Sequence, residues 1–145
     1  MLKKKFFLAT AESCTGGLIA AACTDLDGSS LWFDRGFVTY SNAAKADMLG
    51  VDAEVITQFG AVSEQVATAM ALGAIEHSVA QVSVAVTGVA GPSGGSIEKP
   101  VGTVWLGWCI SGQTTTKLCH FEGDRATVRA LTVQHALRGL VDRLQ

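Results

Sequence analysis

The segment Gln81–Val86, with the sequence QVSVAV, limits what this chain can fold into more than any other. A short, nearly continuous run of apolar, mostly β-branched residues is typical of a strand that is buried on both faces. Segment 64–78 has helical patterning and follows Ser63, a residue that can cap a helix. A helix that leads into a buried strand indicates a parallel sheet covered by helices, which is an α/β fold.

The other expected elements follow in a fixed order along the chain. They are strand 6–10, helix 16–24, strand 32–40, a short helix after Ser41 or Asn42 that ends at Gly50, a helical turn or short helix 52–59, helix 64–78, strand 81–86, strands 102–110 and 114–121 joined by the hairpin SGQ, and a helix from Asp124 toward Leu144. Helix 16–24 is apolar nearly all round, so we expect it to be buried. Trp105 and Trp108 should face opposite sides of strand 102–110.

This order predicts the architecture. Helical crossovers favour parallel pairing of the first three strands, and the hairpin adds an antiparallel strand. We therefore expect residues 1–145 to form a single domain, an α/β/α sandwich of three layers around a mixed, mostly parallel sheet of about five strands.

Composition excludes several classes of function. Apolar residues make up 48% of the chain and charged residues 17%, and the mean hydropathy is +0.33. A buried sheet or a subunit interface accounts for these values, so we expect a homo-oligomer. The net charge is −2 with no basic stripe, which argues against nucleic-acid binding.

Localisation can also be read from composition. The apolar run 6–9 is too short for a signal sequence, and no segment is long enough to span a membrane. The four cysteines show neither a C-x-x-C pair nor a histidine at zinc-binding spacing. We expect reduced thiols in a cytoplasmic protein without a metal site, with Cys23 and Cys109 in the core.

Polar residues follow three strands that the topology places side by side. Ser13 follows the first strand, Tyr40 and Lys45 follow the second, and Thr87 begins a glycine-rich loop, 87–102, after the third. The carboxyl ends of parallel strands meet at one edge of the sheet, where α/β proteins bind ligands. The sequence thus predicts a polar site at this edge.

Ser13 needs a base before it can act as a nucleophile. His77, His120 and His135 lie in other segments, where a structural role is the simpler interpretation. Lys45 is the available base, but it must lose solvation to act while neutral. The alternative is a solvated lysine on the surface of a short helix.

Other residues near Ser13 have two interpretations each. The N–H groups near Gly16 and Gly17 can bind an anion or an oxyanion, or the pair only forms a tight turn. Glu12 can orient Lys45, bind a ribose hydroxyl or serve as a helix-entry charge. Cys14 is either a rival nucleophile or a semi-buried structural cysteine. One turn apart on the last expected helix, Arg125 and Arg129 can clamp a phosphate or form surface ion pairs.

Several longer motifs resemble one family. They are TAESCTGG, GSSLWFDRGFVTYSNAAKADMLGV, GAVS, VTGVAGPSGGSIEKPVGTVW and FEGDRATVR, which span Thr10 to Arg129 in order. On these motifs the chain resembles the nicotinamide-nucleotide amidohydrolases, the stand-alone form of the CinA C-terminal domain.

The resemblance implies a hydrolase without metal or cofactor, which converts nicotinamide mononucleotide to nicotinate mononucleotide and ammonia in pyridine-nucleotide salvage. It implies a Ser-Lys pair, Ser13 and Lys45, with Tyr40 near the site. For substrate binding we expect the residues around these groups: Glu12, Cys14, Thr15, Gly16, Gly17, Thr87, Gly88, Gly91 and Arg129. The small-molecule nucleotide is the expected partner, without nucleic acid or membrane.

Two alternatives remain at this point. The chain can be a catalytically silent nucleotide-binding or protein-interaction module, or an enzyme that acts on another amide or ester of a nucleotide. The family's usual helix before the first strand is missing from this sequence. We therefore expect an uncovered sheet face or a second subunit over it.

Overall fold

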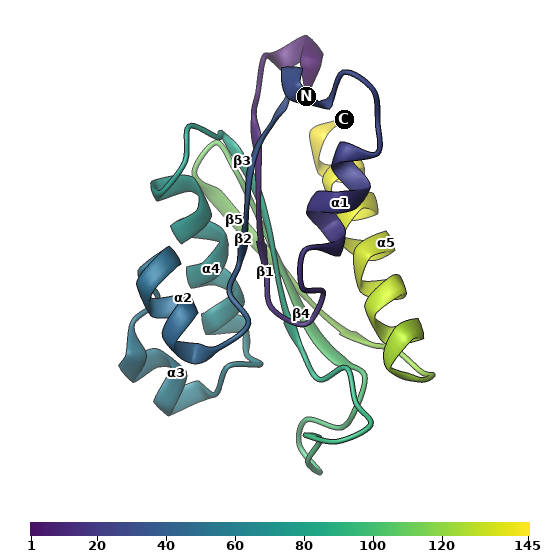
Figure 1. Ribbon diagram of the computed structural model, residues 1–145. Coiled ribbons are helices and arrows are strands. Elements are labelled where there is room, and N and C mark those ends of the chain that lie inside the picture. The colour runs from purple at the N-terminus through teal and green to yellow at the C-terminus, as the bar shows by residue number, and fades with distance from the viewer.

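Five strands form one sheet in the order β2-β1-β3-β4-β5 in the computed structural model, which describes residues 1–145 (Figure 1). The strands are β1 (Leu8–Glu12), β2 (Phe33–Val38), β3 (Val82–Gly88), β4 (Thr103–Ile110) and β5 (Gln113–His120). β1 pairs in parallel with β2 and β3, whereas β4 is antiparallel to both β3 and β5. The predicted mixed sheet with a C-terminal hairpin is confirmed, and only β4 runs against the other strands.

Helices cover both faces of this sheet and complete the predicted three layers (Figure 1). α1 (Leu18–Thr24) and α5 (Arg125–Leu144) cover one face, and α2 (Asn42–Leu49), α3 (Ala53–Phe59) and α4 (Glu64–Glu76) lie on the other. Short 3-10 turns span Leu2–Lys4 and Ser29–Leu31. Two hydrophobic cores result, because successive side chains of a strand point to opposite faces. Val82, Val84 and Val86 of β3 belong to the α1–α5 core, and Ala85 belongs to the other.

The predicted helix caps position the helices of the second layer. Ser41 Oγ accepts a hydrogen bond from Ala44 N at 3.0 Å, and Ser63 Oγ accepts one from Val66 N at 3.2 Å. Gly50 ends α2 in the left-handed region, with φ of 66°. The cap and the terminal glycine set where α2 begins and ends. Lys45 and Leu49 lie four residues apart on one face of this helix, and both are buried.

The first helix differs from the prediction. α1 begins two residues later than expected, because Gly16 and Gly17 adopt positive φ values of 59° and 105° and form a turn. The expectation that this helix is buried all round is wrong, since Leu18 is 40% exposed and only Ile19 and Cys23 are buried. Alanine and leucine promote helix formation as well as burial, so an apolar helix need not be a buried one.

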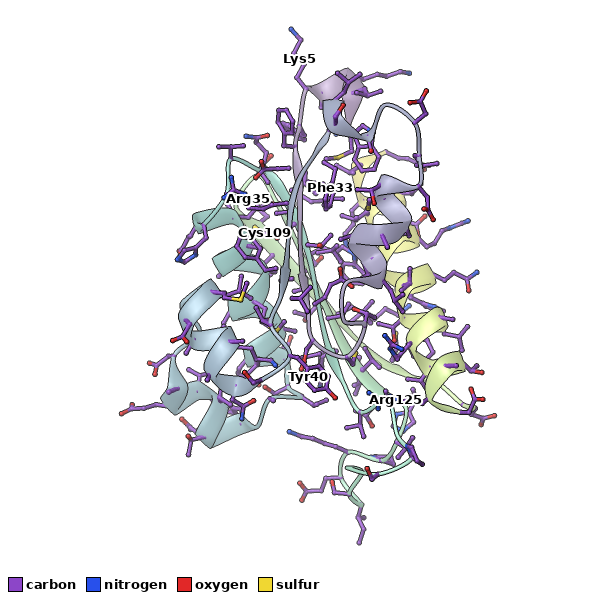
Figure 2. All side chains as sticks on the ribbon, in the orientation of Figure 1. Lys5, Phe33, Arg35, Tyr40, Cys109 and Arg125 are labelled. Atoms are coloured by element: carbon purple, nitrogen blue, oxygen red, sulfur yellow. The ribbon has the colours of Figure 1, made fainter.

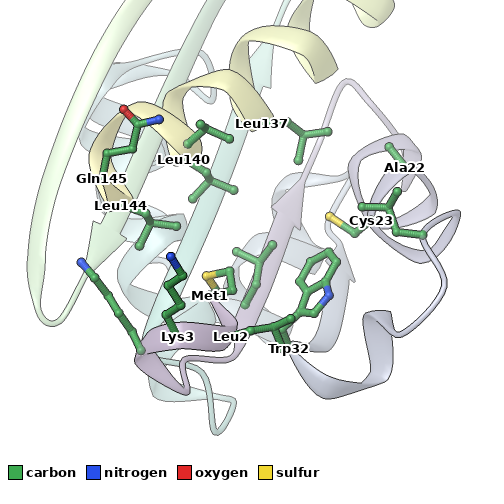
Figure 3. Close-up of a pocket in the computed structure, with 14 residues that line it drawn as sticks. Met1, Leu2, Lys3, Ala22, Cys23, Trp32, Leu137, Leu140, Leu144 and Gln145 are labelled. Atoms are coloured by element: carbon green, nitrogen blue, oxygen red, sulfur yellow. The ribbon is translucent and has the colours of Figure 1, made fainter.

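An apolar groove lies at the amino end of β1, away from the predicted site (Figure 3). Its volume is about 860 Å³, and it is lined by residues of the N-terminal turn, α1, the segment before β2 and α5, including Leu2, Cys23, Trp32 and Leu137. Leu8, the first residue of β1, lines the groove, whereas Ser13 follows the last. No helix of the chain has the length and apolar character needed to cross a membrane.

Candidate active site

The carboxyl ends of β1, β2 and β3 bring the candidate residues together. Ser13 N donates to Val86 O of β3 at 3.1 Å, and Thr39 N donates to Glu12 O of β1 at 2.8 Å. These bonds extend the parallel pairing one residue past the strands and hold the Glu12–Ser13 peptide unit between β2 and β3. Figure 2 shows Tyr40 and Arg125 at this same end of the sheet.

Lys45 reaches from α2 to this edge and contacts Ser13. Its Nζ lies 3.0 Å from Ser13 Oγ, 2.9 Å from Thr39 O and 3.2 Å from Tyr40 O. A lysine amine has three donors in its charged form, and a neutral amine has two donors and one lone pair. The two carbonyls and the Ser13 hydroxyl can accept from all three donors of the charged amine. In the neutral form the amine can instead donate to both carbonyls and accept the Ser13 proton.

Lys45 is only 1% exposed, so the solvated surface lysine that the sequence left open is excluded. Burial lowers the pKa of Lys45, and this effect outweighs an opposing interaction with Cys14. The two ion pairs of the chain, Arg35–Asp34 and Arg138–Asp142, do not involve it. With no carboxylate to hold its charge, the amine meets the requirement for a base near neutral pH.

Tyr40 contributes its backbone to this cluster. Its carbonyl oxygen accepts from Lys45 and lies 3.5 Å from Ser13 Oγ, while its side chain is 65% exposed. The phenol therefore stands free at the mouth of the site, where an incoming ligand can meet it.

Glu12 is fully buried and faces α1 rather than Lys45. Its carboxylate accepts from the Thr15 hydroxyl at 2.6 Å and from the backbone N–H groups of Gly17, Ile19 and Ala20 at 3.2, 2.8 and 3.0 Å. A carboxylate at a helix N-terminus is favoured by the free N–H groups and the helix dipole. These contacts favour the helix-entry role over direct contact with Lys45 or a ligand.

The turn between Ser13 and α1 leaves two N–H groups without a partner. Gly16 N donates to Ser13 O, Gly17 N to Glu12, and Leu18 N to Thr15 O. Cys14 N and Thr15 N donate to no other residue. Thr15 is fully buried, so only the Cys14 N–H remains as a candidate donor to a developing oxyanion beside Ser13.

Cys14 is in the core rather than in the site. It is 5% exposed and packs in the α1–α5 core, and burial raises its pKa to about 11. The thiolate is the nucleophilic form of cysteine, so this neutral thiol is a poor rival to Ser13.

The two arginines of α5 bind loop carbonyls. Arg129 Nε and Nη2 donate to Cys14 O and Thr15 O at 3.1 and 3.2 Å, and Arg125 Nη1 donates to Gly91 O at 2.9 Å. Both also line a cavity of about 640 Å³ between the glycine loop and the start of α5. The first role of this pair is thus to tie two loops to one helix.

The predicted residues of β3 and of the loop that follows it have structural contacts. Thr87 is buried, and its hydroxyl donates to Ala61 O at 2.8 Å. Gly88 packs so closely on Val104 that a Cβ atom there would lie 2.6 Å from Cγ2 of that residue. Gly91 has a φ of 82°, in the left-handed region that favours glycine. These three residues shape the loop at the site's edge.

The histidines do not join the cluster. Nδ1 of His77 and of His135 each lies 2.9 Å from the carbonyl oxygen one turn earlier in the chain, Gly73 O and Leu131 O. His120 is exposed on β5.

Two contacts that build the site could not be predicted from residue types. Thr39 acts through its carbonyl, a group that every residue has, and Lys99 Nζ donates to Phe59 O at 2.7 Å and ties the glycine loop to the end of α3. Only the folded structure shows either contact.

Comparison with known proteins agrees with this geometry. The profile of the CinA C-terminal domain matches residues 1–144. The chain is 54% identical over 143 residues to the nicotinamide-nucleotide amidohydrolase PncC of Enterobacter agglomerans, covering 95% of this chain and 87% of that protein. It is 53% identical to the protein of the same name from Escherichia coli K12, covering 90% of this chain and 80% of that protein.

A solved structure supports the same relationship. The competence/damage inducible protein CihA from Agrobacterium tumefaciens superposes with a TM-score of 0.96 at 50% identity, covering 99% of this chain and 88% of that one. The chain therefore belongs to the CinA C-terminal domain family.

Proposed function

We propose that this protein hydrolyses the carboxamide of nicotinamide mononucleotide to nicotinate mononucleotide and ammonia, in pyridine-nucleotide salvage. The observation that carries the proposal is the 3.0 Å contact between Ser13 Oγ and the Lys45 amine, which is buried and forms no ion pair with a carboxylate. The substrate comes from the relatives named nicotinamide-nucleotide amidohydrolase.

The first step is attack by Ser13. Neutral Lys45 keeps two N–H bonds to Thr39 O and Tyr40 O and accepts the hydroxyl proton on its lone pair. The Ser13 oxygen forms a bond to the carboxamide carbon, and the carbonyl π electrons move to the oxygen. The Cys14 N–H would stabilise this oxyanion, by about 3 kcal/mol for one donor.

The second step expels ammonia. The tetrahedral intermediate collapses, its C–N bond breaks, and Lys45 returns its proton to the leaving nitrogen, directly or through the exposed Tyr40 phenol. Water then attacks the ester on Ser13 and gives a proton to Lys45. The C–O bond to Ser13 breaks, and the serine oxygen takes that proton back.

The phosphate would lie against the glycine loop or an arginine. Both arginines border the 640 Å³ cavity at the loop, but Arg125 spends one donor on a carbonyl and Arg129 spends two. This difference favours the loop N–H groups and Arg125 for the phosphate. Thermal stabilisation by nicotinamide mononucleotide, compared with nicotinamide riboside, measures whether the phosphate is recognised.

Three further proposals concern the whole protein. We propose that residues 1–145 act as one domain, that the protein is cytoplasmic and that it forms a homo-oligomer. The four free cysteines are consistent with a reducing compartment. The groove beside α5 offers an apolar surface for a second subunit.

Ammonia release from nicotinamide mononucleotide tests the proposed function, with wild type, Ser13→Ala and Lys45→Ala measured side by side. The proposal expects an active wild type and a loss of about 10² to 10⁴-fold in kcat for Lys45→Ala. Circular dichroism checks that both variants fold. A folded but inactive wild type would favour the catalytically silent module.

A further inference from the structure

Tyr40 has its backbone inside the site and its side chain at the surface. The carbonyl oxygen accepts from Lys45 Nζ at 3.2 Å and lies 3.5 Å from Ser13 Oγ. The side chain is 65% exposed, and Figure 2 shows the residue at the carboxyl end of the sheet. A ligand whose reacting group contacts Ser13 is therefore within reach of the Tyr40 ring.

The ring of Tyr40 has no partner within the chain. Only the carbonyl of this residue makes side-chain contacts, and the hydroxyl forms no hydrogen bond. No other aromatic ring stacks on it, and the cation that lies over a ring in this protein, Arg143, covers Trp108. Both faces of the phenol ring are thus free of any contact that holds a structure together.

The proposed substrate brings a positive charge to this place. Its carboxamide is attached to a pyridinium ring, whose quaternary nitrogen is a permanent cation. Lys45 also becomes positive when it accepts the Ser13 proton, and two like charges repel. A site for this substrate therefore needs an electron-rich group that contacts the ring.

The acidic side chain beside Ser13 is not available for this task. Glu12 is fully buried, and its carboxylate accepts from the Thr15 hydroxyl and from N–H groups at the start of α1. A free carboxylate near Lys45 would also favour the charged, inactive amine. An aromatic face attracts a cation through its quadrupole and carries no net charge, so it avoids this conflict.

We propose that Tyr40 is a specificity residue, which binds the cationic ring of the substrate through its aromatic face and does not relay a proton to the leaving ammonia. The inference rests on the proposed function. It means that the site selects carboxamides on a positively charged ring over a neutral ring of the same shape. Lys45 then returns its proton to the leaving nitrogen directly.

Binding of two matched ligands tests the selection for charge. Calorimetry in a Ser13→Ala background, where substrate is not consumed, gives Kd for nicotinamide mononucleotide and for its C-nucleoside analogue with a neutral benzamide ring. The ratio of the two Kd values cancels stacking and shape. We expect Tyr40→Leu to lower the preference for the cation by about 2 to 30-fold and Tyr40→Phe, which keeps an aromatic face, to retain it. An unchanged ratio in Tyr40→Leu would overturn the proposal.

Phe33→Leu is the matched control. Phe33 is the first residue of β2 and Tyr40 follows the last, so the two lie at opposite ends of this strand (Figure 2). The same aromatic-to-leucine change there should keep the Kd ratio. Every Tyr40 variant retains the carbonyl that holds Lys45, and a thermal melt checks that each one folds.

Turnover by a protein with Ser13 intact separates ring binding from proton relay. Tyr40→Phe lacks the hydroxyl, so a relay predicts that kcat for ammonia release falls by about 10² to 10⁴-fold with KM unchanged. That result would overturn the proposal. Ring binding predicts a smaller loss of kcat in Tyr40→Phe, less than about tenfold, and a higher KM in Tyr40→Leu than in Tyr40→Phe.

The same measurements distinguish failure of this inference from failure of the proposed function. If the Ser13→Ala protein prefers the cation in a Tyr40-dependent way but wild type releases no ammonia, the reaction is wrong and the role of Tyr40 stands. If wild type releases ammonia and the ratio is independent of Tyr40, only the inference fails. Binding of neither ligand, with no ammonia released, would overturn both.

Discussion

At the scale of single residues, the account depends on the protonation of Lys45. Burial lowers the pKa of Lys45 from the value of 10.5 for a free lysine. The neutral amine is therefore populated at lower pH than in a free lysine. The base is active only when neutral. Activity should therefore be lost as pH falls through the lowered pKa and should reach a plateau above it.

The pH dependence of kcat/KM measures this directly, because it reports the groups of the free enzyme. We expect an acidic limb with a midpoint below 10.5. Lys45→Arg is the control, provided that the variant keeps residual activity. If its pH profile has an acidic limb with the same midpoint as wild type, the titration belongs to another group.

Cys14 provides a second test at this scale. Because its pKa is raised to about 11, the thiol stays protonated near neutral pH and should resist iodoacetamide at pH 8. We expect Cys14→Ala to keep kcat within a few fold and to lose about 1–2 kcal/mol of stability from lost packing. Mass spectrometry after alkylation and an ammonia assay are the measurements; a labelled Cys14 in the folded protein would contradict this prediction.

Ser13, Lys45 and Arg129 differ in how much of their role could be predicted from the sequence. Ser13 and Lys45 could be selected from their types and from the strand ends that they follow. The burial of Lys45 could not, because it depends on how α2 docks on the sheet. The contact of Arg129 with Cys14 spans 115 positions, and no local pattern encodes it.

At the scale of elements, Glu12 holds α1 in place. Its carboxylate collects three backbone N–H groups at the start of this helix, a role that glutamine cannot fill because its NH₂ group would face donors. We expect Glu12→Gln to lower the free energy of unfolding by about 1.5–3 kcal/mol. Urea denaturation is the measurement, with the exposed Glu122→Gln as control, and equal stability of the two variants would contradict the cap.

Gly139 lies in α5, and its replacement by alanine should lower the stability of the protein instead of raising it. Alanine is the better helix former by about 1 kcal/mol, so Gly→Ala normally stabilises a helix. At Gly139 a Cβ atom would collide with the indole of Trp108. Overpacking costs about 1–3 kcal/mol, so Gly139→Ala should be destabilising in a thermal melt. A higher melting temperature would show that α5 moves away from the sheet at little cost.

Whether a segment forms a helix or a strand was largely predictable from the sequence, because the spacing of hydrophobic residues and the capping residues are local signals. Helices α2, α4 and α5 begin after their predicted caps, and the β4–β5 hairpin forms as expected. The exposure of α1 was not predictable, since its apolar face can meet the sheet, another helix or solvent. Tertiary packing decides among these.

At the scale of the whole molecule, the groove beside α5 bears on assembly. Val141 lines the groove and is 51% exposed, so a charge there should not disturb the core. If the groove forms the proposed subunit contact, Val141→Glu should convert the oligomer to a monomer in sedimentation velocity. Ser13 lies at the opposite edge of the sheet, so the variant also tests whether activity needs assembly. An oligomer that tolerates Val141→Glu would place the contact elsewhere.

Trapping the covalent intermediate tests the central claim most directly. The protein is mixed with nicotinamide mononucleotide, quenched in acid within milliseconds, digested and examined by mass spectrometry. The account predicts that the peptide carrying Ser13 gains the mass of the nicotinoyl mononucleotide, and that Ser13→Ala and Lys45→Ala show no adduct. Ammonia release by wild type with no adduct on Ser13, or with an adduct on another residue, would contradict the Ser-Lys mechanism.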